Sequence, residues 1–131
     1  LEISFQGAVF AAVGTCGQRC TSLRRIYLHD SIYDAFVARM VKAYASVTIG
    51  DPMAEGILMG PMHSEQGVRE YLEGIEKIKA QGGRVLCGGK KLPGAGNYVE
   101  PTIVEISPNA PIVNEEIFAP IVYVFKFDNL E

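Results

Sequence analysis

Residues 121–127 constrain the fold more than any other stretch of the chain. Their sequence, Ile-Val-Tyr-Val-Phe-Lys-Phe, is β-branched and aromatic, and its only charged residue is Lys126. Strands of this composition are typically buried on both faces, which requires other elements to cover the sheet above and below. We therefore expect residues 121–127 to form a buried central strand of a sheet.

Helix-like and strand-like patterns are mixed along the rest of the chain. Apolar residues at helical spacing predict three helices, at residues 3–13, 31–46 and 65–81. Short β-like runs predict three further strands, at residues 24–28, 84–87 and 98–106, although Pro101 limits the last to an edge or an irregular position. This mixture predicts an α/β fold.

Two serines carry helix-start signals. Ser31, with Asp34 three residues later, resembles a capping box at the start of the second helix. Ser64 follows a Gly-Pro break and fits the N-cap position of the third helix.

The composition is that of an ordinary globular domain. The chain has 131 residues, 48% apolar and 21% charged, with a net charge of −3 and dispersed basic residues. The chain therefore has no basic patch that would suit binding to nucleic acid or to an anionic membrane. We also expect no membrane span and no signal peptide. Residues 1–7 resemble a viral-protease cleavage remnant but also fit a native helix, the interpretation that we favour.

Cys20 is the first candidate for chemistry. It lies in residues 14–21, Gly-Thr-Cys-Gly-Gln-Arg-Cys-Thr, and Arg19, Arg24 and Arg25 are close in sequence. A reactive thiol must be partly ionised, which nearby cations favour, and a glycine-cornered turn can direct backbone N–H groups at a reacting oxygen. Composition alone still favours a structural role, because a free cysteine is usually a small core residue.

We interpret the other two cysteines as packing residues. Three cysteines in a chain of this size indicate free thiols in a reducing compartment rather than a disulfide framework. Cys16 could be a resolving thiol, a metal ligand or a packing residue, and we favour packing for both Cys16 and Cys87. We predict no metal site, because Cys-x3-Cys lacks a nearby histidine and both His29 and His63 are isolated.

Residues 114–120 form the second candidate site. Two acidic residues and an aromatic residue lie in an irregular segment just before the predicted central strand, a position suited to ligand binding in α/β proteins. The alternative, which composition alone favours, is a solvated acidic turn with Phe118 in the core.

Together the two stretches resemble the aldehyde dehydrogenase superfamily. Its cysteine signature appears as residues 17–20 (Gly-Gln-Arg-Cys), and its second landmark as residues 116–120 (Glu-Ile-Phe-Ala-Pro), where Ala119 replaces the usual glycine. The likeness covers essentially the whole chain. A narrower likeness, which includes residues 96–102, is to the antiquitin branch, in which Cys16 would replace a usual alanine.

The resemblance implies a fold and roles for four residues. The fold would be part of an aldehyde dehydrogenase catalytic domain, with a mostly parallel sheet flanked by helices. Cys20 would attack the aldehyde, forming a thiohemiacetal and, after hydride transfer to NAD (or NADP), a thioester. Glu116 would bind the nicotinamide ribose, Phe118 would pack beside the nicotinamide, and Arg19 would anchor the carboxylate end of α-aminoadipic semialdehyde, the antiquitin substrate.

The resemblance also implies that much of the enzyme lies outside the chain. Residues 1–131 would be a single segment of the catalytic domain, without the Rossmann coenzyme domain, the C-terminal oligomerisation segment, the general-base glutamate or the oxyanion asparagine. We expect this segment alone to be inactive. The full-length enzyme would be a homodimer or homotetramer, cytoplasmic or alternatively mitochondrial, acting on a small aldehyde and binding neither nucleic acid nor membrane.

Two other functions stay open on sequence grounds. One is a coenzyme A-acylating semialdehyde dehydrogenase, in which coenzyme A rather than water resolves the thioester. The other is an inactive, thiol-bearing binding domain.

Overall fold

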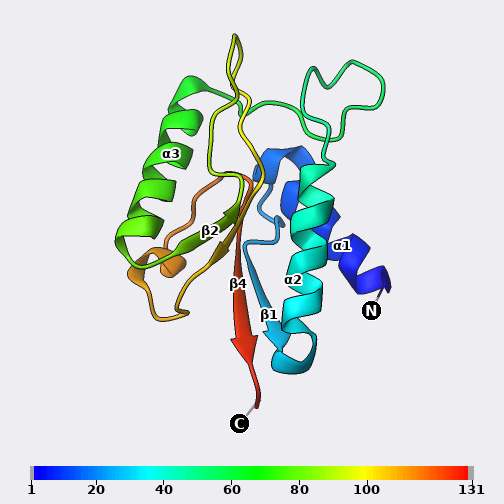
Figure 1. Cartoon of the computed structure of the whole chain (residues 1–131). Helices are drawn as coiled ribbons and strands as arrows, with labels where there is room; N and C mark the ends of the chain where they lie inside the picture. Colours follow the sequence, from blue (N-terminus) through cyan, green and yellow to red (C-terminus); the bar gives the residue numbers. More distant parts are fainter. Residues whose placement is uncertain (1, 130–131) are drawn as a thin grey trace.

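The computed structural model describes residues 2–129 (Figure 1). In chain order its elements are α1 (Glu2–Val13), the 3-10 helix η1 (Gly14–Gly17), β1 (Arg25–His29), α2 (Asp30–Ala45), α3 (Glu65–Ala80), β2 (Arg84–Cys87), β3 (Thr102–Glu105), the 3-10 helix η2 (Pro111–Asn114) and β4 (Ile121–Phe127). None of the helices within these residues is long and apolar enough to cross a lipid bilayer.

The four strands form one sheet in the order β1-β4-β3-β2. β4 pairs in parallel with both of its neighbours, Tyr123 opposite Arg25 of β1 and Ile121 opposite Thr102 of β3. β2 pairs antiparallel with β3. Residues 121–125 of β4 are all buried. The predictions of a buried central strand and of a mostly parallel α/β sheet are therefore confirmed.

α2 and α3 cover opposite faces of the sheet. The Tyr33 hydroxyl of α2 donates to Glu105 at 2.6 Å, whereas the Tyr71 hydroxyl of α3 lies 2.8 Å from Thr102 Oγ1. Thr102 and Glu105 are three residues apart on β3, and such positions point to opposite faces of a strand. Figure 1 shows the same arrangement, with α3 on one side of the strands and α2 on the other.

α1 packs beside α2 on the same side of the sheet (Figure 1). The Phe5 ring meets the Phe36 ring edge-on, with centroids 5.5 Å apart. The predicted helix is confirmed, but Ile3 and Phe10, which its apolar spacing includes, are exposed. The helix contains residues 2–7, whereas Leu1 lies outside the described residues.

The helix-start predictions had different outcomes. Ser64 caps α3 as predicted, because its hydroxyl accepts from the Gly67 N–H at 3.1 Å. The capping box at Ser31 is wrong. α2 begins one residue earlier, and His29 is its N-cap, with Nδ1 accepting from the Ser31 N–H at 3.2 Å.

The strand predictions also needed correction at their ends. β1 begins at Arg25 rather than Arg24. β3 contains only residues 102–105 of the predicted 98–106. Pro101 has no N–H to donate to a neighbouring strand, and before it Val99 forms only an isolated bridge with Lys91.

Candidate active site

The two candidate stretches meet at one edge of the sheet. The Cys20 segment leads into β1 and residues 114–120 lead into β4, and these strands are parallel neighbours. Both segments therefore lie at the amino ends of their strands. Ligands of open α/β sheets usually bind at the carboxyl ends of the strands, so this candidate site does not follow the general rule.

Cys20 lies at the tip of a hydrogen-bonded turn. The Ser22 N–H donates to the Arg19 carbonyl oxygen at 3.0 Å, and the Arg19 N–H donates to Ser22 Oγ at 3.2 Å. The thiol is exposed, and among residues 2–129 no group accepts a hydrogen bond from the Cys20 N–H. The turn therefore presents both a sulfur atom and a free backbone donor.

The backbone just before this turn is left-handed. Thr15, Cys16 and Gly17 have φ angles of 52°, 55° and 66°. This conformation costs an ordinary residue about 1–2 kcal/mol, and such strain collects at functional sites. It redirects the chain between the end of α1 at Val13 and the Cys20 turn, which begins at Arg19.

Gly17 lies in direct backbone contact with the second candidate segment. A Cβ atom at this position would lie 2.3 Å from the Ala119 carbonyl oxygen and 2.6 Å from the Pro120 nitrogen. Only glycine permits this approach. Ala119, where the family usually has glycine, does not have a positive φ, so its methyl group causes no backbone strain.

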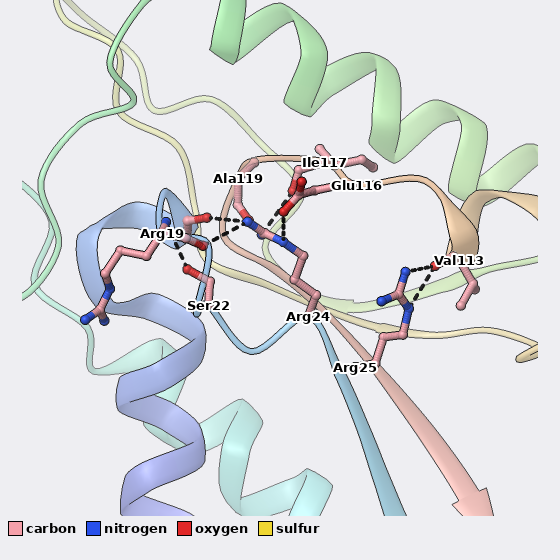
Figure 2. A network of polar contacts seen from close by, with 9 residues as sticks. Arg19, Ser22, Arg24, Arg25, Val113, Glu116, Ile117 and Ala119 are labelled. Atoms are coloured by element: carbon pink, nitrogen blue, oxygen red, sulfur yellow. Dashed lines mark hydrogen bonds and ion pairs between the residues drawn. The ribbon is translucent and has the colours of Figure 1, made fainter.

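Arg24 joins the two segments from below (Figure 2). Its Nη2 donates to the carbonyl oxygens of Gly17 and Arg19, at 3.1 and 3.3 Å, just before Cys20 in the chain. Its Nη1 donates to the carbonyl oxygens of Ile117 and Ala119, at 3.1 and 3.3 Å. One guanidinium, on a side chain that is only 12% exposed, therefore connects residues more than 90 positions apart in the chain.

Glu116 and Phe118, the predicted coenzyme contacts, both touch the same guanidinium. Arg24 Nε donates to Glu116 Oε1 at 3.0 Å, while the Glu116 side chain stays 60% exposed. The guanidinium lies 5.0 Å from the centroid of the Phe118 ring, which is 41% exposed. The alternative that places Phe118 in the core is wrong.

Arg19 points away from this network, toward α1 (Figure 2). Its guanidinium lies 5.3 Å from the Phe10 ring centroid and so close to Gly14 that a Cβ there would be 2.2 Å from Nη2. Within residues 2–129 no carboxylate forms an ion pair with it, and its Nε is buried without a hydrogen-bond partner. The Arg19 guanidinium therefore has no charged partner among residues 2–129.

Gln18 connects the Cys20 segment to residues 61–63. Its Nε2 donates to the Pro61 carbonyl oxygen at 3.2 Å, and its Oε1 accepts from the His63 N–H at 2.8 Å. The glutamine of the sequence signature thus positions the loop. Sequence alone indicated no role for Gln18, and it indicated Arg24 only as one of the nearby cations that could favour ionisation of the Cys20 thiol.

The remaining cysteines are in packed surroundings. Cys16 is 1% exposed, its Sγ lies 3.6 Å from Met62 Sδ, and burial raises its pKa to about 12. Burial also raises the pKa of Cys87. These surroundings agree with packing roles. Residues 2–129 contain no group of three or more His, Cys, Asp or Glu side chains arranged to bind a metal ion.

A cleft rich in carboxylates lies beside the Glu116 loop. It is lined by α3 and by residues 112–117, including Glu70, Glu73, Glu115 and Glu116. Lys77 lies in the same cleft and pairs with Glu115 at 3.6 Å. The edge of the site that adjoins α3 is therefore negatively charged.

Comparison with known proteins agrees with this geometry. The sequence profile described as the aldehyde dehydrogenase family matches residues 1–131. The chain belongs to the aldehyde dehydrogenase family. Its resemblance to the antiquitin branch is also confirmed, because similar curated proteins are members of aldehyde dehydrogenase family 7.

Three aldehyde dehydrogenase relatives illustrate the similarity. Family 7 member A1 of Brassica napus is 49% identical over 131 residues, covering 100% of the chain and 26% of that protein. The alpha-aminoadipic semialdehyde dehydrogenase of Rattus norvegicus is 50% identical over 132 residues, covering 100% and 24%. The NAD+ complex of an aldehyde dehydrogenase from Bacillus cereus superposes with a TM-score of 0.94 at 32% identity, covering 98% and 26%.

The chain spans about a quarter of the length of these aldehyde dehydrogenases. Its structural likeness to a solved family member confirms the predicted catalytic-domain fold. The roles of Cys20, Arg19, Glu116 and Phe118 stay predictions.

Proposed function

We propose that this chain is the nucleophile-bearing segment of a nicotinamide-dependent aldehyde dehydrogenase, with Cys20 as the nucleophile. One observation carries the proposal. The backbone at Gly17, just before the exposed Cys20 turn, packs directly against the backbone of the loop that carries Glu116 and Phe118. A thiol and a coenzyme-binding carboxylate held at one edge of a sheet suit oxidation through a covalent thioester.

The chemistry of Cys20 follows from its surroundings. Its thiolate forms a C–S bond with the aldehyde carbon, and the carbonyl π electrons move to oxygen, giving a thiohemiacetal anion. The free Cys20 N–H can donate to that oxygen. Loss of a hydride from the same carbon to bound NAD+ would convert the thiohemiacetal into a thioester. Water then cleaves the resulting thioester, releasing a carboxylate and the thiol, with a base that we place outside these 131 residues.

The exposed groups near Arg24 fit one end of a nicotinamide coenzyme. Arg24 engages Glu116 Oε1, while Oε2 has no partner among residues 2–129 and can accept from a ribose hydroxyl. The half-exposed Phe118 ring offers an apolar surface for an aromatic ring. NAD is the coenzyme that we propose.

We place the carboxylate end of the substrate on Arg19. The rat relative is named for α-aminoadipic semialdehyde, and a guanidinium without a carboxylate partner suits a bidentate contact with such a molecule. Gly14→Ala would place a methyl group 2.2 Å from Arg19 Nη2 and displace it. In the full-length enzyme, KM for α-aminoadipic semialdehyde should rise about tenfold, whereas KM for hexanal should stay unchanged. An equal rise for both aldehydes would contradict this role of Arg19.

The nucleophile is tested by Cys20→Ala in the full-length protein. Aldehyde oxidation should disappear while the Kd for NAD+, from fluorescence titration, stays close to that of the parent. Cys16→Ala is the matched control, since Cys16 lies in the same loop but is buried against Met62. Its activity should persist. Turnover retained in the Cys20 variant would refute the assignment.

We also propose that the Rossmann half, the oligomerisation segment and the general base belong to other parts of a longer enzyme. The chain's coverage of about a quarter of its relatives supports this division. The isolated 131 residues should then show no NAD+ reduction with any aldehyde. Adding coenzyme A to the full-length enzyme distinguishes hydrolysis of the thioester from acyl transfer, because only the acylating alternative yields an acyl-CoA product.

A further inference from the structure

The Arg24 guanidinium is saturated by acceptors from the two site segments. A guanidinium has five N–H donors, and the five hydrogen bonds of Arg24 go to four backbone carbonyl oxygens and Glu116 Oε1. The side chain is 12% exposed. If it were lost, these carbonyl oxygens would lose their donor next to the reacting thiol.

These hydrogen bonds connect the Cys20 segment to residues 116–119. One amino group of the guanidinium bonds to the carbonyl oxygens of Gly17 and Arg19, in the backbone that leads into Cys20. The other amino group and Nε bond to residues 116–119. The planar fork fixes the distance between the two segments, which a flexible point charge such as lysine cannot do.

Arg24 also sets how both proposed coenzyme contacts face the site. It fixes Glu116 through one carboxylate oxygen and leaves the other open, and it lies over the Phe118 ring. The same group therefore determines where the ribose acceptor lies and where the thiol turn lies.

We propose that Arg24 is a positioning residue that aligns Cys20 and the Glu116 loop as one unit. This proposal rests on the function proposed above for Cys20 and Glu116. A positioning role predicts that one substitution of Arg24 changes both the reactivity of the Cys20 thiol and the affinity for the coenzyme, while the protein stays folded. A purely structural role does not predict this pair of effects.

The test is Arg24→Lys in the full-length protein, with Arg25→Lys as the matched control. Arg25 is the next residue, but its guanidinium bonds to the Val113 carbonyl oxygen, outside the two segments (Figure 2). Two quantities are measured: the rate of Cys20 alkylation by iodoacetamide without coenzyme, and the Kd for NAD+. Circular dichroism confirms the fold of each variant.

Arg24→Lys should change both quantities by about tenfold, the effect of one lost hydrogen bond to a charged group. Arg25→Lys should leave both within about twofold of the parent. The proposal is overturned if Arg24→Lys leaves either quantity at the control level. Alkylation of Cys20 can be measured without catalytic turnover. If the parent protein does not oxidise aldehydes, the proposed function is refuted, whereas the role of Arg24 is still tested by the alkylation rates.

A second variant covers the case in which Arg24→Lys does not fold. Glu116→Lys changes a 60% exposed side chain and places an ammonium group beside the guanidinium, which should displace Arg24 from its acceptors. Alkylation of Cys20 without coenzyme should then change by about fivefold. An unchanged rate in this variant would overturn the proposal.

Discussion

Replacing Gly17 by alanine would impose two free-energy costs that glycine avoids at the site. The first is backbone strain, because Gly17 has a φ of 66°. The second is overlap, because the new Cβ would lie 2.3 Å from the Ala119 carbonyl oxygen and 2.4 Å from the Ala119 carbonyl carbon. These are backbone atoms, which cannot rotate away as a flexible side chain could.

The structure contains a control with only the first cost. Gly56 has a φ of 79°, but a Cβ there would meet nothing within 4 Å. Gly56→Ala should therefore cost about 1–2 kcal/mol, from the left-handed conformation alone. Gly17→Ala should add about 1–3 kcal/mol for overpacking, giving about 2–5 kcal/mol in total.

The assay is urea denaturation of the full-length protein and both variants, together with the alkylation rate of Cys20. Gly17→Ala should reduce the free energy of unfolding more than Gly56→Ala, and it alone should change the thiol reactivity. The reasoning is refuted if the two variants agree in free energy of unfolding within about 0.5 kcal/mol, the scatter of ordinary surface substitutions.

Two further predictions concern titratable groups. At pH values near neutrality iodoacetamide should label Cys20 before Cys16, because burial raises the Cys16 pKa to about 12 and keeps its thiol protonated; mass spectrometry showing equal labelling would contradict this. The hydrogen bond from Tyr33 holds the pKa of Glu105 below its ordinary value, so this carboxylate stabilises the fold above that value and the contribution disappears as the pH falls through the lowered pKa. Tyr33→Phe should therefore reduce the free energy of unfolding at about pH 6, and this reduction should shrink as the pH falls through the lowered pKa of Glu105, as measured by urea denaturation. A reduction that is the same at every pH would contradict a contribution from the ionised carboxylate.

Elements whose pattern depends on local sequence could be predicted. The period of α3 and the composition of β4 follow from which face or faces each element buries, and both predictions are confirmed. α1 shows the limit of the same method. Its apolar residues occur all round the helix, so spacing could not show that Ile3 and Phe10 are exposed whereas Phe5 is buried.

The site could be predicted as two motifs but not as one constellation. Cys20 and Glu116 carry recognisable chemistry, and the sequence proposed both. The role of Arg24 depends on carbonyl oxygens, which every residue possesses, brought within reach only by the pairing of β1 with β4. Gly17 is similar, because its close neighbour is a backbone group 102 positions away in the chain.

The placement of β4 has a consequence for how the chain is made. β4 lies between β1 and β3, both of which precede it in the chain. Until residues 121–127 leave the ribosome, β1 has no partner strand among residues 2–129, and within the same residues β3 has only β2. A polypeptide truncated just before Ile121 would keep the thiol and the Glu116 loop in its sequence but would leave two strand edges open to pairing with other chains, a recognised route to aggregation.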